Sequence, residues 1–264
     1  MNSDRTLNVA LLSIDIAQND PHANLEATET LLRKLNPGTD LVVLPELFST
    51  GYCNSRDTIS ELAETVSGKT ITRIKKWAAS FNCAFAGSFL CRVGDSFFNR
   101  AFFIEPGGDE TYYDKRHLFS LSHENTLYTP GISPFRTVRF RGWNISMIVC
   151  YDLRFPVWAR NTGNLYDLLI VPANWGNTRQ YAWQHLLIAR AIENQAYVIG
   201  INRSGTDDYG TYDNTSLVIG PKGNILELPE TNNIIQATLS LQKVLDIRAY
   251  LPALNDADHF SIDV

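Results

Sequence analysis

The sequence predicts an α/β protein in which two β-sheets are stacked and helices cover their outer faces. Strand and helix patterns alternate along the 264 residues, which is typical of α/β proteins. Residues 41–44 are apolar at every position, as expected for a strand that is covered on both faces. Strand patterns are also numerous and hairpin turns interrupt the alternation, which disfavours a purely parallel, doubly wound sheet. Because no linker or internal repeat divides the chain, we expect one domain over residues 1–264.

The first half of the chain has two helix patterns among five strand patterns. Side chains recur at helical spacing over residues 25–35, and the sequence Asn36-Pro37-Gly38 ends this helix. The same spacing predicts a second helix over residues 71–81. The strands expected in this half are residues 7–14, 41–44, 83–92, 97–105 and 111–114.

The second half of the chain has the same character. The sequence Arg141-Gly142-Trp143 indicates a hairpin turn, and residues 180–194 form a long helix pattern with Trp183 and Leu187 on one stripe. The strands expected here are residues 135–140, 144–149, 168–172, 197–202, 214–219 and 234–239. The tail from Leu251 has too little periodicity for a core element, so we expect it to be disordered or docked on another subunit.

Charge and composition exclude several classes of protein. The net charge is −5, the pI is about 5.5 and no basic run occurs, which argues against nucleic acid or a membrane surface as a partner. The apolar stretch of residues 7–16 is interrupted by Asn8, Ser13 and Asp15, unlike a signal peptide, and no run approaches the roughly 18 apolar residues of a membrane span. We therefore expect a cytoplasmic protein. Its four cysteines form no CxxC pair, so we expect free thiols and no structural zinc.

Cys150 follows an apolar strand pattern in a way that suits a nucleophile. The strand of residues 144–149 ends at this cysteine, and we expect Pro156 to open a helix shortly afterwards. A thiol at a strand-to-helix turn is accessible at the edge of a sheet, near backbone N–H groups that stabilise a thiolate or an oxyanion. The alternative is that Cys150 is a small buried core residue.

Two other strand patterns end in charged side chains. Glu46 directly follows residues 41–44, where apolar walls raise the pKa of a carboxyl group and suit it to general-base catalysis. Lys115 ends the strand of residues 111–114 and would favour a thiolate or neutralise an oxyanion. Taken alone, Glu46 could be a solvated loop residue and Lys115 a surface charge. Together with a thiol, they form the set that attack on a carbonyl carbon requires.

Five ordered motifs resemble the nitrilase superfamily of carbon–nitrogen hydrolases, and the resemblance covers nearly the whole chain. The motifs are Leu44-Pro45-Glu46 with Phe48 and Gly51-Tyr52, Tyr113-Asp114-Lys115 with His117-Leu118-Phe119, Cys150-Tyr151-Asp152-Leu153-Arg154-Phe155-Pro156, Pro172-Ala173-Asn174-Trp175, and Arg190-Ala191-Ile192-Glu193-Asn194. The third and fourth are most similar to the ω-amidase branch, which hydrolyses the side-chain amide of α-keto acids. The resemblance implies a four-layer α-β-β-α sandwich. It also implies a homodimer in which the C-terminal tail, about residues 249–264, reaches across the interface.

The resemblance also implies which residues act. Glu46 is implied as the general base, Lys115 as the oxyanion-stabilising cation, Cys150 as the nucleophile, and Glu124 as a second glutamate that positions Lys115 or the substrate. The thiolate would attack the amide carbon and form a thioester, which water activated by the general base would cleave, with no metal or organic cofactor. Residues 120–128 are short and polar, which departs from better-known members and predicts a different lid over the site.

Substrate recognition has more than one interpretation. Arg154 lies four residues after Cys150 and could pair with a substrate carboxylate or form a structural ion pair. Tyr151 and Trp175 could wall a small pocket, although Trp175 is equally well explained as a core aromatic. We expect a small ω-amide of an α-keto acid, α-ketoglutaramate or α-ketosuccinamate, as substrate. The alternatives are another amide, a carbamoyl compound or a nitrile, or a catalytically silent binding module with the same fold.

Overall fold

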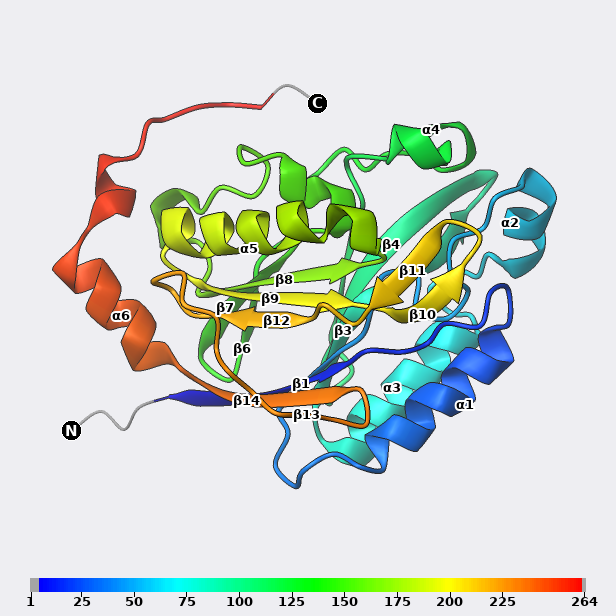
Figure 1. Cartoon of the computed structure of the whole chain (residues 1–264), viewed down its shortest axis with the longest axis horizontal. Coiled ribbons are helices and arrows are strands. Elements are labelled where there is room, and N and C mark those ends of the chain that lie inside the picture. Colours follow the sequence, from blue (N-terminus) through cyan, green and yellow to red (C-terminus); the bar gives the residue numbers. More distant parts are fainter. Residues whose placement is uncertain (1–4, 263–264) are drawn as a thin grey trace.

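Two β-sheets lie face to face, and helices cover their outer faces, in the computed structural model, which describes residues 5–262 (Figure 1). The core between the sheets combines side chains of both, such as Leu11 from the first sheet and Ile145 and Ile199 from the second. A separate core fills the space between the first sheet and its helices. These layers confirm the predicted α-β-β-α sandwich. Residues 1–4 and 263–264 of the predicted domain lie outside the described residues.

The first sheet is mixed. Its strand order is β13-β14-β1-β2-β3-β4-β5, with bounds Glu230–Thr231, Ile234–Ser240, Thr6–Leu12, Leu41–Val43, Ala84–Val93, Ser96–Ile104 and Glu110–Asp114. Strands β1, β2 and β3 are parallel neighbours, and the other pairs are antiparallel. Helices α1 (Pro21–Leu32) and α3 (Lys69–Phe81) pack on its outer face (Figure 1). In β2, Leu41 and Val43 face the second sheet while Val42 faces the helices, which explains why the whole strand is apolar.

The second sheet is smaller. Its strand order is β12-β9-β8-β7-β6, with bounds Leu217–Ile219, Tyr197–Asn202, Leu168–Ala173, Trp143–Met147 and Val138–Phe140. Helix α5 (Gln180–Asn194) covers its outer face through Trp183 and Leu187. A side chain at Gly200 would place its Cβ 2.4 Å from Leu187, so glycine there allows α5 to approach β9 closely.

The β6–β7 turn is one residue shorter than expected. Arg141 and Gly142 have φ values of 48° and 84°, the left-handed pair that closes a two-residue hairpin. Trp143 is therefore the first residue of β7 rather than part of the turn.

Sequence analysis missed several short elements. They are α2 (Arg56–Leu62), α6 (Leu241–Tyr250) and the hairpin of β10 (Ser204–Asp207) and β11 (Gly210–Asp213). Helix α2 has only seven residues with one buried side chain, and the hairpin strands have four residues each. Helix α2 and the hairpin carry too few buried positions to produce a clear hydrophobic period, whereas α6 buries Leu241, Val244 and Ile247 at a spacing of three, a signal that could have identified it.

The expectation of a helix opening at Pro156 is wrong. Cys150–Arg154 forms a short 3-10 helix, η2, and residues 156–159 form only a turn. Phe155 separates the two with φ −112° and ψ 90°, because a residue that precedes proline is excluded from the helical region.

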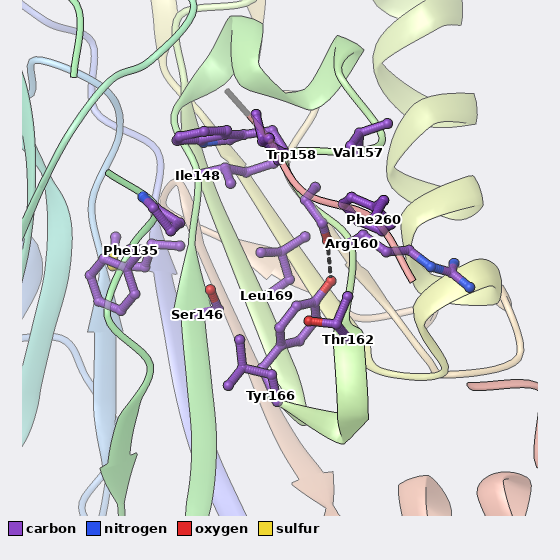
Figure 2. Close-up of a pocket in the computed structure, with 15 residues that line it drawn as sticks. Phe135, Ser146, Ile148, Val157, Trp158, Arg160, Thr162, Tyr166, Leu169 and Phe260 are labelled. Atoms are coloured by element: carbon purple, nitrogen blue, oxygen red, sulfur yellow. Dashed lines mark hydrogen bonds between the residues drawn. The ribbon is translucent and has the colours of Figure 1, made fainter. Parts of the chain in front are cut away.

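The C-terminal tail contacts its own chain in the described residues. After α6, Ala253–Asp256 forms a 3-10 helix, η5, and the chain continues without regular structure to residue 262. Phe260 and Ile262 line a cavity of about 330 Å³ together with Trp158 (Figure 2). The described part of the tail is therefore placed against its own chain rather than disordered, and its docking on a second subunit stays a prediction.

Candidate active site

Segments from both sheets bring three charged side chains and one thiol to the wall of a single cavity. They are Glu46 after β2, Lys115 after β5, Glu124 at the start of α4 (Glu124–Leu127) and Cys150 at the start of η2. The cavity has a volume of about 180 Å³. These four residues are the catalytic set predicted from the sequence, and the structure brings all four together.

Lys115 lies between two carboxylates. Its Nζ is 2.9 Å from Glu46 Oε1 and 2.8 Å from Glu124 Oε2. The exposed side-chain fractions of Lys115, Glu46 and Glu124 are 3%, 5% and 2%. Charges this deeply buried are tolerated only when they are paired, so the three groups depend on one another.

The Glu46 carboxylate is oriented by further donors. Asn99 Nδ2 donates to Oε1 at 2.7 Å, and the backbone N–H of Asn174 donates to Oε2 at 2.9 Å. The chain turns sharply after Glu46, because Leu47 has a φ of 46° and its N–H donates to Ser88 Oγ at 2.9 Å. The turn is thereby tied to β3, and both carboxylate oxygens are held in place.

Cys150 lies on a strained turn. Its φ of 44° is in the left-handed region, which a non-glycine residue adopts only when its surroundings enforce it. Two hydrogen bonds close the turn: Asp152 N–H donates to Val149 O at 2.9 Å, and Val149 N–H donates to Asp152 Oδ2 at 3.0 Å. The turn presents the thiol to the cavity.

Asp152 also joins this turn to the segment that carries Lys115. Its Oδ1 accepts from the backbone N–H of His117 at 2.8 Å and lies 2.8 Å from His117 Nδ1, while Oδ2 accepts from Tyr113 Oη at 2.6 Å. Tyr113 and His117 stand two residues before and after Lys115. A single carboxylate that is fully buried therefore connects the turn of Cys150 with the segment that carries Lys115.

The electrostatics of the cavity favour a neutral thiol and a charged lysine. Burial raises the pKa of the Cys150 thiol well above its usual value, the negative charge of Glu46 raises it further, and Lys115 only partly opposes them. Burial disfavours the Lys115 ammonium, but Glu124 and Glu46 outweigh this effect and hold its pKa well above the usual value. Burial also raises the pKa of Glu124, against the effect of Lys115. The Cys150 thiol therefore stays protonated at neutral pH unless a nearby base removes its proton.

Sequence analysis missed Asn99, whose Nδ2 reaches Glu46. In β4 the buried positions alternate, and Asn99 lies in the buried register between Phe97 and Ala101. An amide at a position where the alternation predicts an apolar side chain is the signal that could have identified it. The remaining cavity residues without an assigned role from the sequence are Tyr52, Phe119, Leu121, Ser122, Asn174, Arg179, Tyr209 and Tyr212.

The three residues predicted to bind substrate do not line this cavity. The Arg154 guanidinium lies 4.9 Å over the ring of Trp175, which is buried. Tyr151 packs against Phe119 and Phe155, with ring centroids 5.0 and 5.3 Å apart. Tyr151, Arg154 and Trp175 are therefore outside the cavity wall, although Tyr151 contacts Phe119, which lines it.

The mouth of the cavity is formed by two outer segments, residues 120–127 and the β10–β11 hairpin. Tyr52 connects them: its Oη donates to Ser122 O at 2.8 Å, and its ring packs edge-on against Tyr209, with centroids 5.1 Å apart. Arg203 fixes the β10 end of the hairpin, because its buried guanidinium donates to Asp207 Oδ2 at 2.8 Å. The mouth is thus assembled from short outer segments rather than from the two stacked sheets.

Two structural features are absent from residues 5–262. No group of three or more His, Cys, Asp and Glu side chains there is arranged to hold a metal ion. No helix in the same range combines the length and apolar character needed to cross a bilayer.

Known carbon–nitrogen hydrolases are similar to this chain over nearly its whole length. Residues 8–249 match the carbon-nitrogen hydrolase family. The chain is 39% identical over 259 residues to Omega-amidase YafV of Escherichia coli (strain K12), which covers 97% of this chain and 98% of that protein. It is 32% identical over 252 residues to 2-oxoglutaramate amidase of Bacillus subtilis (strain 168), covering 94% and 96%.

A solved structure of a CN-hydrolase superfamily protein has the same fold. The protein XC1258 of Xanthomonas campestris, described as a CN-hydrolase superfamily protein with an arsenic adduct in the active site, superposes with a TM-score of 0.92 at 37% identity, covering 99% of this chain and 100% of that one. The chain therefore belongs to the carbon–nitrogen hydrolases of the nitrilase superfamily and is a hydrolase of carbon–nitrogen bonds other than peptide bonds.

Proposed function

We propose that this enzyme is a thiol-dependent ω-amidase. It hydrolyses the side-chain amide of small α-keto acid ω-amides, α-ketoglutaramate and α-ketosuccinamate, to the dicarboxylate and ammonia. The observation that carries the proposal is the buried Lys115, held between Glu46 and Glu124 on the wall of the cavity that contains Cys150. The names of two relatives, an omega-amidase and a 2-oxoglutaramate amidase, support the substrate class.

The first chemical step is attack on the amide carbon. Glu46 takes the proton of the Cys150 thiol, the sulfur–carbon bond forms, and the carbonyl oxygen becomes an oxyanion. Lys115 and the backbone N–H of Tyr151 stabilise this oxyanion, and loss of one such donor typically costs about 3 kcal/mol. The high pKa of the buried thiol makes the proton transfer to Glu46 necessary at neutral pH.

The thioester forms and is hydrolysed in the next two steps. The oxyanion collapses, the carbon–nitrogen bond breaks, and Glu46 returns the proton to the departing nitrogen, so that ammonia leaves. Glu46 then takes a proton from water, which attacks the thioester, and the carbon–sulfur bond breaks as the thiol is reprotonated. Glu124 keeps Lys115 charged and in position throughout, at 2.8 Å.

Ammonia release from a panel of substrates tests the proposal. The panel contains α-ketoglutaramate, α-ketosuccinamate, the uncharged pentanamide, and pentanenitrile. We expect the two keto-acid amides to react with the highest kcat/KM, and Cys150→Ala to abolish turnover. The matched control is Cys83→Ala, which removes a buried thiol outside the cavity and leaves the rate unchanged.

Three results would contradict the proposal. A preference for the nitrile would assign a different carbon–nitrogen substrate, and full activity of Cys150→Ala would remove the nucleophile from the mechanism. The third would be the absence of an acyl adduct on Cys150 when enzyme stopped during turnover is analysed by mass spectrometry. The thioester mechanism requires this adduct in the wild-type enzyme and its absence in Cys150→Ala.

We also propose a homodimer with the C-terminal tail, residues 249–264, at the interface. Tyr250 and Leu251 are 86% and 53% exposed, so the end of α6 presents apolar surface that a second copy could cover. Sedimentation velocity should give a dimer for the full chain and a monomer for the double variant Tyr250→Ser, Leu251→Ser. A monomeric wild-type protein would contradict this arrangement.

A further inference from the structure

The cavity wall carries one positive charge that the protein leaves without a carboxylate partner. Lys115 is engaged by Glu46 and Glu124 at 2.9 and 2.8 Å. Arg179 lines the same cavity, yet no carboxylate of residues 5–262 lies within ion-pair distance of its guanidinium. The guanidinium lies instead 5.2 Å from the ring centroid of Phe119, another cavity residue. Arginine on an aromatic face keeps its N–H edges available for a ligand.

Arg179 is carried by a segment that is fixed from two sides. It ends the 3-10 helix η4 (Asn177–Arg179), directly before α5 begins. Its backbone carbonyl accepts from Trp175 Nε1 at 2.8 Å. Asn177 Oδ1 accepts from the backbone N–H of Asp213 at 2.9 Å, which ties the segment to the β10–β11 hairpin. The guanidinium is therefore presented by a braced backbone rather than by a free loop.

We infer that Arg179 binds the carboxylate at the far end of the substrate and thereby selects ω-amido acids over neutral amides. This inference rests on the proposed function. The guanidinium plane matches a carboxylate with two parallel hydrogen bonds, a geometry that an ammonium does not offer. Lys115 is already held by two carboxylates close to the thiol, so it serves the developing oxyanion. The substrate's own carboxylate then has one available cation on the cavity wall, Arg179.

The carboxylates of the cavity make this cation important for anionic substrates. Glu46 and Glu124 carry two negative charges against the single charge of Lys115, so an anionic substrate meets repulsion near the thiol. Arg179 offsets that repulsion for a substrate with a carboxylate at its other end. A neutral amide gains nothing from it, and this difference is the origin of the selectivity.

Arg154 provides a matched control, because both arginines stack on aromatic rings. Its guanidinium lies 4.9 Å over Trp175, but it is not on the cavity wall. Steady-state kinetics should be measured for α-ketoglutaramate and for pentanamide with Arg179→Gln, Arg179→Lys and Arg154→Gln. We expect Arg179→Gln to raise KM for α-ketoglutaramate about 100-fold with little change in kcat, and to leave pentanamide unaffected.

The other two variants sharpen the result. Arg179→Lys retains the charge but loses the planar pair of donors, so KM for α-ketoglutaramate should rise about 10-fold. It also keeps the experiment decisive if Arg179→Gln fails to fold. Arg154→Gln should change both substrates by less than about 3-fold, because its guanidinium lies outside the wall.

The outcomes separate this inference from the function on which it rests. If wild-type enzyme does not prefer α-ketoglutaramate to pentanamide, the ω-amidase proposal itself fails. If wild type has the preference and Arg179→Gln retains it, or if Arg179→Gln harms both substrates equally, only the role of Arg179 is overturned. Selective loss of α-ketoglutaramate turnover in Arg154→Gln would transfer the role to Arg154.

Discussion

The floor and the rim of the cavity are built in different ways. The floor is the set of buried wall residues Glu46, Lys115, Glu124 and Cys150 together with Asn99, which donates to Glu46 from outside the wall. The rim is the pair of exposed side chains Leu121 and Tyr209. Four of the floor side chains follow strands or lie within them and Glu124 begins α4, and charged hydrogen bonds join Glu46, Asn99, Lys115 and Glu124. The rim side chains come from short outer segments, and they are 80% and 43% exposed.

This difference separates chemistry from recognition. In the floor, each charge depends on its neighbours, because a buried ion without its partner is costly. A change there should alter stability and catalysis together. In the rim, side chains remain largely in water, so a change should affect substrate binding and leave the free energy of unfolding almost unchanged.

The largest expected effect is that of Lys115→Met. The substitution removes the cation between Glu46 and Glu124, so kcat/KM should fall about 10³-fold, and the free energy of unfolding should fall by about 3–5 kcal/mol. The deficit in stability should shrink as the pH is lowered. Burial raises the pKa of Glu124 and Lys115 opposes this, so removal of Lys115 raises that pKa further. Protonation of Glu124 at low pH then relieves the unpaired buried charge, and this relief is lost as the pH rises through the folded-state pKa. Urea unfolding at several pH values and steady-state kinetics measure both effects.

The control for this prediction is the same substitution at an exposed ion pair. Lys75 Nζ lies 2.8 Å from Glu110 Oε2, but both side chains are more than 30% exposed. Lys75→Met should cost less than about 1 kcal/mol and leave kcat/KM unchanged. Equal costs for Lys75→Met and Lys115→Met would show that the floor is not coupled in the way described.

Glu46→Gln should lower kcat about 10³-fold, the usual range for removal of a general base. It should also shift the titration of Cys150 in a defined direction. The negative charge of Glu46 is one cause of the raised thiol pKa, so its removal should lower the pH at which the thiolate appears. The thiolate absorbance near 240 nm, or the pH dependence of alkylation by iodoacetamide, reports this shift. A thiol that titrates at higher pH in Glu46→Gln would contradict the electrostatic account.

Much of the floor was predictable from sequence, because its residues follow apolar strands. Glu46 comes directly after an all-apolar strand, and Lys115 and Cys150 end two others. Glu124 was identified through the family resemblance alone. Asn99 was missed because it lies within a strand, where only its buried register distinguishes it from an exposed amide.

The rim and the wall were less predictable, because contacts between distant segments place their residues. Arg179 reaches the cavity on a segment that is tied to Asp213 of a hairpin that the sequence did not predict. Arg154 was favoured because it is close to Cys150 in sequence. The short helix η2 directs its side chain onto Trp175 instead, and no local pattern indicates that direction.

A smaller effect is expected at the link between the nucleophile turn and the lysine segment. Asp152→Asn retains the shape of the side chain but replaces one acceptor oxygen with a donor, which leaves buried donors unsatisfied. The free energy of unfolding should fall by about 2 kcal/mol, and kcat should fall about 10-fold with KM nearly unchanged, since the distance between thiol and ammonium is no longer fixed. Tyr113→Phe removes the hydrogen bond to Asp152 and also the acceptor of the Arg116 backbone N–H and of Trp158 Nε1, so it should cost about 2 kcal/mol. An increase in KM without loss of kcat would argue that Asp152 acts on substrate binding instead.

The smallest effect is expected for Leu121→Ala at the rim. The side chain is 80% exposed, so its truncation leaves no cavity in the core and breaks no hydrogen bond. The free energy of unfolding should therefore change by less than about 0.5 kcal/mol. Leu121 lines the cavity from its exposed edge, so kcat should be unchanged and KM should rise by no more than about 3-fold. Chemical denaturation and kinetics with α-ketoglutaramate measure both quantities. A large loss of kcat would mean that residues 120–127 close over the floor during catalysis, and the rim would then belong to the chemistry rather than to recognition alone.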